Sequence, residues 1–182
     1  ITEKMRGILV DWLIDVHLKF KLREETLFLT INLIDRFLNK NELTRQKLQL
    51  VGVSAMLIAC KYEEIYAPEV KDFVYVTDNA YSREEVLTME AKILEDIGFS
   101  LFIQSPKLFL ERFLYESSWS GKVQMLSRYI LELSLLEHSY CKYSPLVISS
   151  ASVYLSAKLF KETNPWPASL EGMTSLEECE IR

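Results

Sequence analysis

The side chains that could carry out chemistry are few, and their spacing fits no catalytic motif. The two histidines, His17 and His138, lie in no HExxH, CxxC or GxSxG context. No Gly-x-Gly occurs, so the chain offers no glycine-rich phosphate loop. Glu63 and Glu64 are adjacent carboxylates, but neighbouring residues of a helix point about 100° apart, which makes a poor acid–base pair. The sequence therefore predicts a binding protein and not an enzyme.

Composition narrows the class of protein further. The 182 residues are 49% apolar and 26% charged, with 5 Gly and 5 Pro, which favours a helical globular protein over an all-β one. The net charge of −5 argues against sequence-independent binding to nucleic acid. No apolar run approaches the roughly 20 residues of a membrane span. Cys60, Cys141 and Cys179 lack metal-ligand spacing and indicate a reducing compartment, the cytosol or the nucleus.

The first predicted helix, at about residues 2–22, would position any binding surface near the start of the chain. At about 100° per residue around its axis, its apolar residues fall into two arcs. One arc contains Met5, Ile8, Leu9, Trp12, Leu13 and Val16, and the other contains Val10, Ile14 and Leu18. Lys4, Asp11 and Asp15 separate the arcs on one flank, with Arg6 and His17 on the other. A surface helix normally has one apolar stripe. Two stripes predict either a centrally enclosed helix or one that offers a face to a partner.

Helix signals then follow one another along the chain. Thr2, Thr44 and Ser82 are predicted N-caps, and Ser82 begins a capping-box pattern with Glu85. The segment 50–60 is almost wholly apolar and rich in small residues, which predicts a helix enclosed by its neighbours. The first half of the chain should contain helices at about 2–22, 25–38, 44–64, 69–76 and 82–97.

The second half repeats this order. Ser105-Pro106 and Ser144-Pro145 each place a cap before a proline at the first helical position. Residues 146–151 match 50–55 at four of six positions, where the helix order also repeats. We predict helices at about 105–116, 120–137 and 144–161, a fourth around Leu170, and a fifth that opens at 174–177 and is cut off. The chain is expected to be a fragment of a longer protein.

Six segments, in order and at matching spacing, resemble the mitotic cyclin family. These segments are 5–13 (MRGILVDWL), 33–38 (LIDRFL), 47–52 (KLQLVG), 61–69 (KYEEIYAPE), 73–78 (FVYVTD) and Met89-Glu90. Segments 19–22 and 61–64 favour a B-type over an A-type cyclin, while Gly7 departs from the family's alanine. The resemblance implies an all-α fold of tandem cyclin-like five-helix bundles, an N-terminal box at 1–101 and a C-terminal box at 102–182 that is incomplete at its end.

The resemblance also implies a face that binds a kinase. A lysine late in the third helix and a glutamate in the fifth match Lys61 and Glu90 here. An ammonium offers only donors and a carboxylate only acceptors, so together they could bind both kinds of free backbone group. The apolar residues implied at this face are Ile58, Tyr62, Leu94, Phe99 and Leu101. Ile58 and Leu94 could equally belong in part to the core.

A second implied surface is a docking patch for substrates or inhibitors that carry an Arg-x-Leu motif. The residues implied are Met5, Ile8, Leu9, Trp12, Leu48 and Gln49, with Asp15 and Asp78 as acceptors for the ligand's arginine. A Trp and Met stripe is more often core, but the second arc of the first helix could anchor it instead. Arg6 and Asp35 match an internal ion pair of the family and are predicted to be structural.

The sequence thus predicts a regulatory subunit that binds and allosterically activates a cyclin-dependent Ser/Thr protein kinase at the G2/M transition. The expected partners are the kinase and Arg-x-Leu proteins, in the nucleus and cytoplasm. We expect no cofactor, no metal site, no nucleic acid and no membrane. The alternative is a cyclin-fold transcription module that contacts DNA or basal factors; it would need a basic groove but not Lys61 with Glu90.

Overall fold

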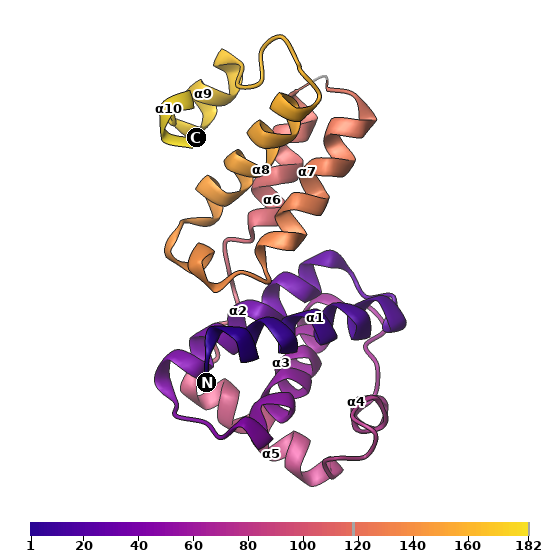
Figure 1. The fold of residues 1–182 in the computed structure, drawn as a ribbon. Coiled ribbons are helices and arrows are strands. Elements are labelled where there is room, and N and C mark those ends of the chain that lie inside the picture. Colours follow the sequence, from indigo (N-terminus) through magenta and orange to yellow (C-terminus); the bar gives the residue numbers. More distant parts are fainter. Residues whose placement is uncertain (118, 182) are drawn as a thin grey trace. The chain divides into compact units, whose positions relative to one another are not determined.

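The computed structural model describes residues 1–117 and 119–181, and the described residues form helices joined by turns. The chain divides into two compact units, Ile1–Ile103 and Gln104–Arg182. The sequence prediction put this boundary at 101/102. Figure 1 shows the helices of both units, and each unit is described by itself below. No described helix is both long and apolar enough to cross a membrane.

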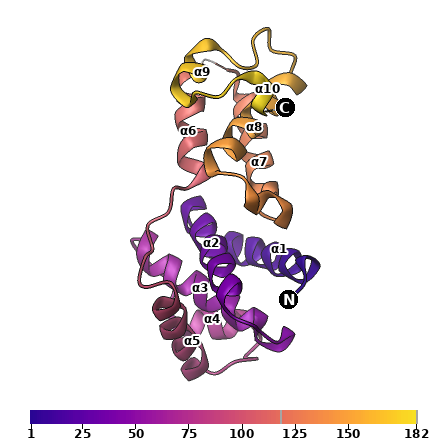
Figure 2. The same cartoon turned by 90° about the vertical axis from the view of Figure 1, so that its left-hand side faces the viewer.

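The first unit surrounds one central helix. Its α-helices are α1 (Glu3–Phe20), α2 (Glu24–Lys40), α3 (Leu48–Glu63), α4 (Val70–Val76) and α5 (Arg83–Asp96), with the short 3-10 helix η1 (Arg45–Lys47) before α3. Helix α3 packs against α1, α2, α4 and α5 (Figure 2). Every residue from Leu50 to Cys60 is buried. The predicted enclosed helix is therefore confirmed.

Local sequence signals account for several helix ends. The Thr2 side chain accepts a hydrogen bond from the Met5 amide, and Ser82 and Glu85 form the predicted capping box. Helix α1 ends at Lys21, which adopts a left-handed conformation (φ 53°). Thr44 lies at the start of η1 but makes no capping bond with its side chain.

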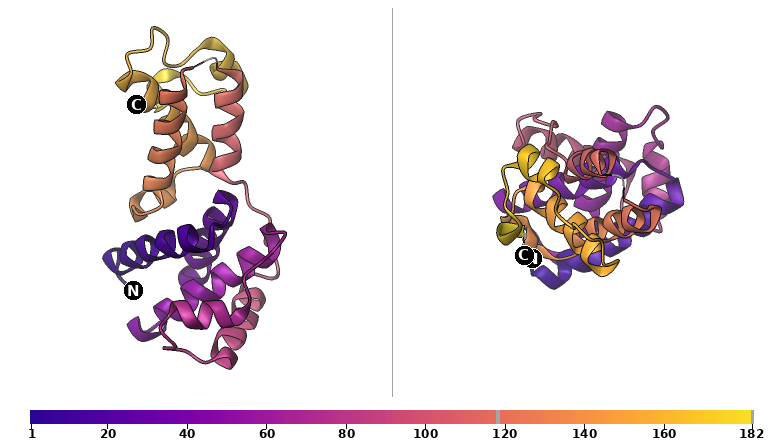
Figure 3. Two further views of the ribbon diagram at one scale, coloured as in Figure 1. Left: turned by 90° about the vertical axis from the view of Figure 1, so that its right-hand side faces the viewer. Right: turned by 90° about the horizontal axis from the view of Figure 1, so that it is seen from above.

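The second unit is built on three helices packed side by side, α6 (Pro106–Glu116), α7 (Gly121–Ser134) and α8 (Pro145–Leu159), as Figure 3 shows. The 3-10 helix η2 (His138–Lys142) follows α7, and α9 (Ala168–Thr174) and α10 (Glu178–Ile181) close the described chain. The Ser105 and Ser144 caps occur as predicted, each with proline at the helix start. Helix α7 ends at Ser134, before the predicted 137.

Each of the two predicted arcs of α1 is divided between the core and the surface: Leu9 and Val10 are buried, whereas Ile8 and Leu18 are exposed. The buried residues of the helix form one continuous face, Arg6, Leu9, Val10, Leu13, Val16 and His17. Arg6 and His17 were expected on a separating flank but lie inside this face. Leu18, assigned to the anchoring arc, is 62% exposed. The reason is that an Arg guanidinium paired with a carboxylate can be buried, which a count of apolar positions does not register.

Candidate functional site

Lys61 and Glu90 meet at the surface of the first unit. Lys61 lies in the last turn of α3 and Glu90 in the middle of α5, and the Nζ atom is 2.7 and 2.9 Å from the two carboxylate oxygens. The lysine side chain is 48% exposed and the glutamate side chain 12%. A second hydrogen bond joins the two helices nearer the start of each: Ser54 Oγ of α3 donates to the Val86 carbonyl of α5 at 3.1 Å. Packing of two helices thus places an ammonium and a carboxylate together at one rim.

The arrangement leaves hydrogen-bonding capacity unused. An ammonium has three donors, and a carboxylate has about four acceptor positions on its two oxygens. Each group can therefore still bind an additional backbone group while it remains paired with the other. Because the pair fixes both side chains, such a partner would not have to order them on binding.

Apolar side chains predicted for the same face differ in their exposure. Tyr62 and Phe99 are exposed, and Leu94 and Leu101 are half-buried. Ile58, by contrast, is 3% exposed because α3 is enclosed at that level, so it belongs to the core of the free chain.

Ile65, Tyr66 and Phe102 are among the exposed apolar residues that the sequence prediction placed in neither surface. The signal that could have found Ile65 and Tyr66 is Pro68, because a proline cannot continue a helix, so the residues between α3 and this proline lie in a connector.

The predicted docking patch on α1 is only partly at the surface. Ile8 is 62% exposed, Asp15 and Asp78 are exposed, and Met5, Trp12 and Gln49 are half-buried. Leu9 and Leu48 are buried, at 5% and 7% exposed. For Leu9 the physical reason is the absent side chain of Gly52, which lets Leu9 pack directly against α3: a Cβ atom at Gly52 would lie 2.9 Å from Leu9 Cδ1.

Arg6 and Asp35 join α1 to α2. Arg6 Nε is 2.6 Å from Asp35 Oδ1 and Nη2 is 2.8 Å from Oδ2, a bidentate pair. The Arg6 side chain is 6% exposed and that of Asp35 26%. The geometry gives the pair a structural role, because the charge of Arg6 is held away from solvent.

The start of α2 is capped from a distant helix. The Glu64 carboxylate, just past α3, accepts hydrogen bonds from the Arg23 amide at 2.7 Å and from Thr26 Oγ1 at 2.5 Å. Buried His17 lies in this region, and burial lowers its pKa from the ordinary 6.5 although Glu24 and Glu64 act to raise it. The Nδ1 atom of His17 is buried with no hydrogen-bond partner among the described residues.

A second charge cluster joins α6 to α7 in the second unit. Arg128 Nε and Nη2 donate to the two Glu111 carboxylate oxygens at 2.7 and 2.8 Å, and Lys107 Nζ is 2.8 Å from the same carboxylate. Hydrogen bonding to Arg128 is the main reason that the pKa of Glu111 falls from 4.5 to about 2; Lys107 adds to it and burial opposes it.

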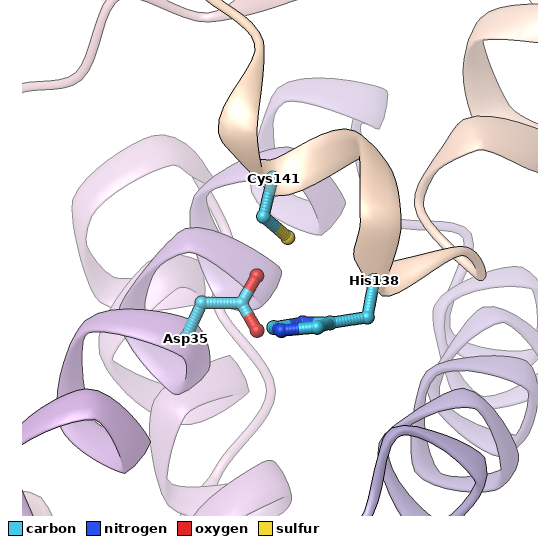
Figure 4. Close-up of side chains that lie close together, drawn as sticks. All are labelled: Asp35, His138 and Cys141. Carbon is cyan, nitrogen blue, oxygen red and sulfur yellow. The ribbon is translucent and has the colours of Figure 1, made fainter.

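The residues drawn in Figure 4 belong to different units. Asp35 projects from α2, whereas His138 and Cys141 project from η2. Within the first unit, Asp35 is the ion-pair partner of Arg6.

Two family models together match nearly the whole chain. The model described as "Cyclin, N-terminal domain" matches residues 1–102, and "Cyclin, C-terminal domain" matches residues 105–182. In each case the matched range corresponds closely to one of the compact units.

Curated relatives include plant and amoebal cyclins. Cyclin-B2-1 of Oryza sativa subsp. japonica is 47% identical over 94% of this chain and 41% of its own length. Cyclin-A2-1 of the same organism is 45% identical over 100% of this chain and 38% of its own length. The G2/mitotic-specific cyclin-B of Dictyostelium discoideum is 43% identical over 100% of this chain and 42% of its own length. The chain thus spans about two fifths of the length of these relatives.

Solved structures share the fold. A viral cyclin from herpesvirus saimiri superposes with a TM-score of 0.86 at 21% identity, covering 99% of this chain and 81% of that one. A chain of the CAK complex of Chaetomium thermophilum gives a TM-score of 0.71 at 18% identity, and the match covers 99% of this chain and 60% of that one. At these identities the likeness shows the fold alone.

Proposed function

Since this chain belongs to the cyclin family, we propose that it binds a cyclin-dependent Ser/Thr kinase and activates it allosterically. The observation that carries the proposal is the Lys61–Glu90 pair, which stands at the rim of the first unit with donors and acceptors to spare. Two exposed rings supply apolar area beside this pair: Tyr62 lies in the last turn of α3, and Phe99 lies just after the end of α5.

The proposed mechanism uses the rigidity of this face. A kinase needs its C helix held inward so that a Lys–Glu ion pair forms in its own active site. Lys61 would donate to backbone carbonyls next to that helix and Glu90 would accept from backbone amides, while the enclosed α3 resists deformation. Holding the C helix inward orders the activation loop, and the chain itself contributes no catalytic group to the reaction.

The test is a kinase-binding titration with a double variant, Lys61→Ala with Glu90→Ala. Hydrogen bonds to charged groups contribute about 1.5–3 kcal/mol each, so we expect affinity to fall at least about tenfold. The matched control is Lys71→Ala with Glu69→Ala, which removes another Lys–Glu pair of the first unit, 2.9 Å apart and well exposed. Unchanged kinase binding by the first variant would place the contact face elsewhere.

We further propose that the exposed side of α1 docks Arg-x-Leu segments. Met5, Ile8, Trp12 and Asp15 lie within one arc of the helix at about 100° per residue. Ile8 and the half-buried Trp12 would receive the ligand's leucine, and Asp15 its arginine. This revised patch excludes Leu9 and Leu48.

The docking test compares two exposed apolar residues of the same helix. We expect Ile8→Ala to weaken binding of a fluorescent Arg-x-Leu peptide, and Leu18→Ala to leave it unchanged. Both side chains are 62% exposed, and ten residues separate them by about 15 Å along the helix axis. Equal effects of the two substitutions would refute the patch.

The timing of this activity is proposed to be the G2/M transition, in the nucleus and cytoplasm. Support comes from the 43–47% identity to B-type and A-type cyclins, some of which are named as G2/mitotic-specific. We expect the protein and its associated kinase activity to peak at G2/M in synchronised cells. Constant abundance and activity through the cycle would contradict this proposal.

A further inference from the structure

Helix α5 ends in an unusual turn that carries Phe99. The Gly98 amide donates to the Glu95 carbonyl at 3.0 Å and the Phe99 amide to the Leu94 carbonyl at 2.9 Å, the pattern of a Schellman motif. Gly98 and Phe99 both have left-handed backbones, with φ of 64° and 56°. Glycine accepts this conformation freely, whereas the β-carbon of a bulky residue disfavours it. The left-handed conformation of Phe99 therefore costs conformational free energy, which contacts from elsewhere in the unit can offset.

Arg36 of α2 makes such contacts. Its Nη1 atom donates to the Ser100 carbonyl at 2.7 Å, and its Nη2 atom donates to the Ile97 carbonyl at 3.4 Å. The guanidinium thus bonds the residues immediately before and after the left-handed pair. Its planar fork of donors suits two carbonyls at fixed separation, which a single ammonium could not reproduce.

A neighbouring contact anchors the helix end but does not reach the turn. Lys40, one helical turn after Arg36, donates from Nζ to the Asp96 carbonyl at 2.7 Å. Lys40 binds a carbonyl of the last turn of α5 and Arg36 binds that of the C-cap residue Ile97, at the helix end where the helix dipole favours positive charge. Arg36 alone of the two bonds residues on either side of Phe99.

The Phe99 ring itself has little to hold it, because the residue is 67% exposed. Its direction is therefore set by the backbone of the turn. We infer that Arg36 is a positioning residue for kinase binding: it clamps residues 97 and 100 so that Phe99 is presented to the kinase in a fixed orientation. This inference rests on the proposed function, since it assumes that Phe99 contacts the kinase.

A double-mutant cycle with kinase affinity as the readout tests the inference. We expect Arg36→Ala to weaken binding about tenfold in the wild-type background and less than about twofold in a Phe99→Ala background, because the clamp acts through the ring. Arg36→Lys can restore one of the two bonds and should give an intermediate loss. Arg45→Ala is the control, an exposed arginine of η1 in the same unit. It should change neither the kinase affinity nor the amide hydrogen exchange described below.

Hydrogen exchange of the free chain gives a readout that needs no kinase. Arg36→Ala should raise the exchange of amides 98–101 about tenfold while the amides in the middle of α5 stay protected. Unchanged exchange at 98–101 would overturn the clamp, whatever the kinase does. Equal loss of affinity in both backgrounds would overturn the positioning role and leave Arg36 merely structural. If exchange rises but Phe99→Ala does not weaken binding, the positioning role falls because the proposed contact face is wrong.

Discussion

Replacing Gly52 by alanine tests how closely α1 approaches α3 and whether Leu9 is a core residue. An ideal Cβ at position 52 lies 2.9 Å from Leu9 Cδ1, 3.4 Å from Cδ2 and 3.5 Å from Leu13 Cδ1. Carbon atoms in good contact are about 3.5–4.0 Å apart, so the leucine has to move. Leu9 and Leu13 are 5% and 0% exposed, which leaves little room for that movement.

Two opposing effects set the size of the change. Alanine is more favourable than glycine inside a helix by about 1 kcal/mol. Overpacking a filled core costs about 1–3 kcal/mol. The free energy of unfolding of Gly52→Ala should therefore be lower than that of the wild type by up to about 2 kcal/mol.

A second background separates these effects. Leu9→Ala removes the clashing methyl groups and should itself cost about 2–5 kcal/mol if Leu9 is in the core. In that background Gly52→Ala keeps only the helix-propensity gain and should stabilise by about 1 kcal/mol. The two substitutions are thus expected to couple by about 1–3 kcal/mol.

Urea denaturation of the intact chain can measure this coupling free energy between Gly52→Ala and Leu9→Ala. Fluorescence of Trp12 reports on the first unit when Trp119 and Trp166, which belong to the second, are replaced by phenylalanine in all variants. Linear extrapolation gives each free energy of unfolding. The reasoning is refuted if Gly52→Ala has the same effect in both backgrounds. A cost of less than about 1 kcal/mol for Leu9→Ala would return that residue to the surface patch.

Three further predictions concern buried or paired charges. Asp35→Asn should lower the free energy of unfolding by about 3–5 kcal/mol, because the Arg6 charge stays buried without its carboxylate, and a loss below 1 kcal/mol in urea denaturation would contradict this. Burial lowers the pKa of His17 below 6.5, so its contribution to stability is complete above pH 6.5 and is lost as pH falls below that value; His17→Gln should flatten the dependence of the melting temperature on pH in that range. The pKa of Glu111 is about 2 instead of 4.5, so its contribution is present above pH 4.5 and is lost as pH falls toward 2; Arg128→Ala should raise the Glu111 pKa measured by NMR titration.

Features that depend on near neighbours in the chain could be predicted from the sequence. The Ser82–Glu85 capping box and the Ser105 and Ser144 caps each join groups no more than three residues apart. The order of helices in the first unit and the enclosed α3 also follow from local periodicity. A short-range pattern is sufficient here because helix formation and capping satisfy backbone groups within one turn.

Pairs such as Lys61 with Glu90 and Arg6 with Asp35 were expected through resemblance to a family, because nothing in their spacing of 29 residues relates them. Arg36 was not predicted at all, because its bond to Ser100 spans 64 residues and had no signal in the sequence. Contacts of this kind depend on how helices cross, which is fixed only when the whole unit packs.

The sequence by itself therefore determined which segments are helices, where most of them begin, and which helix is central. Only the tertiary structure decided which side of α1 is buried, because that depends on Gly52 letting Leu9 approach and on Asp35 neutralising a buried Arg6. Helical periodicity ranks residues by apolarity, whereas burial is decided by the neighbours that cover them, and those neighbours come from distant parts of the chain.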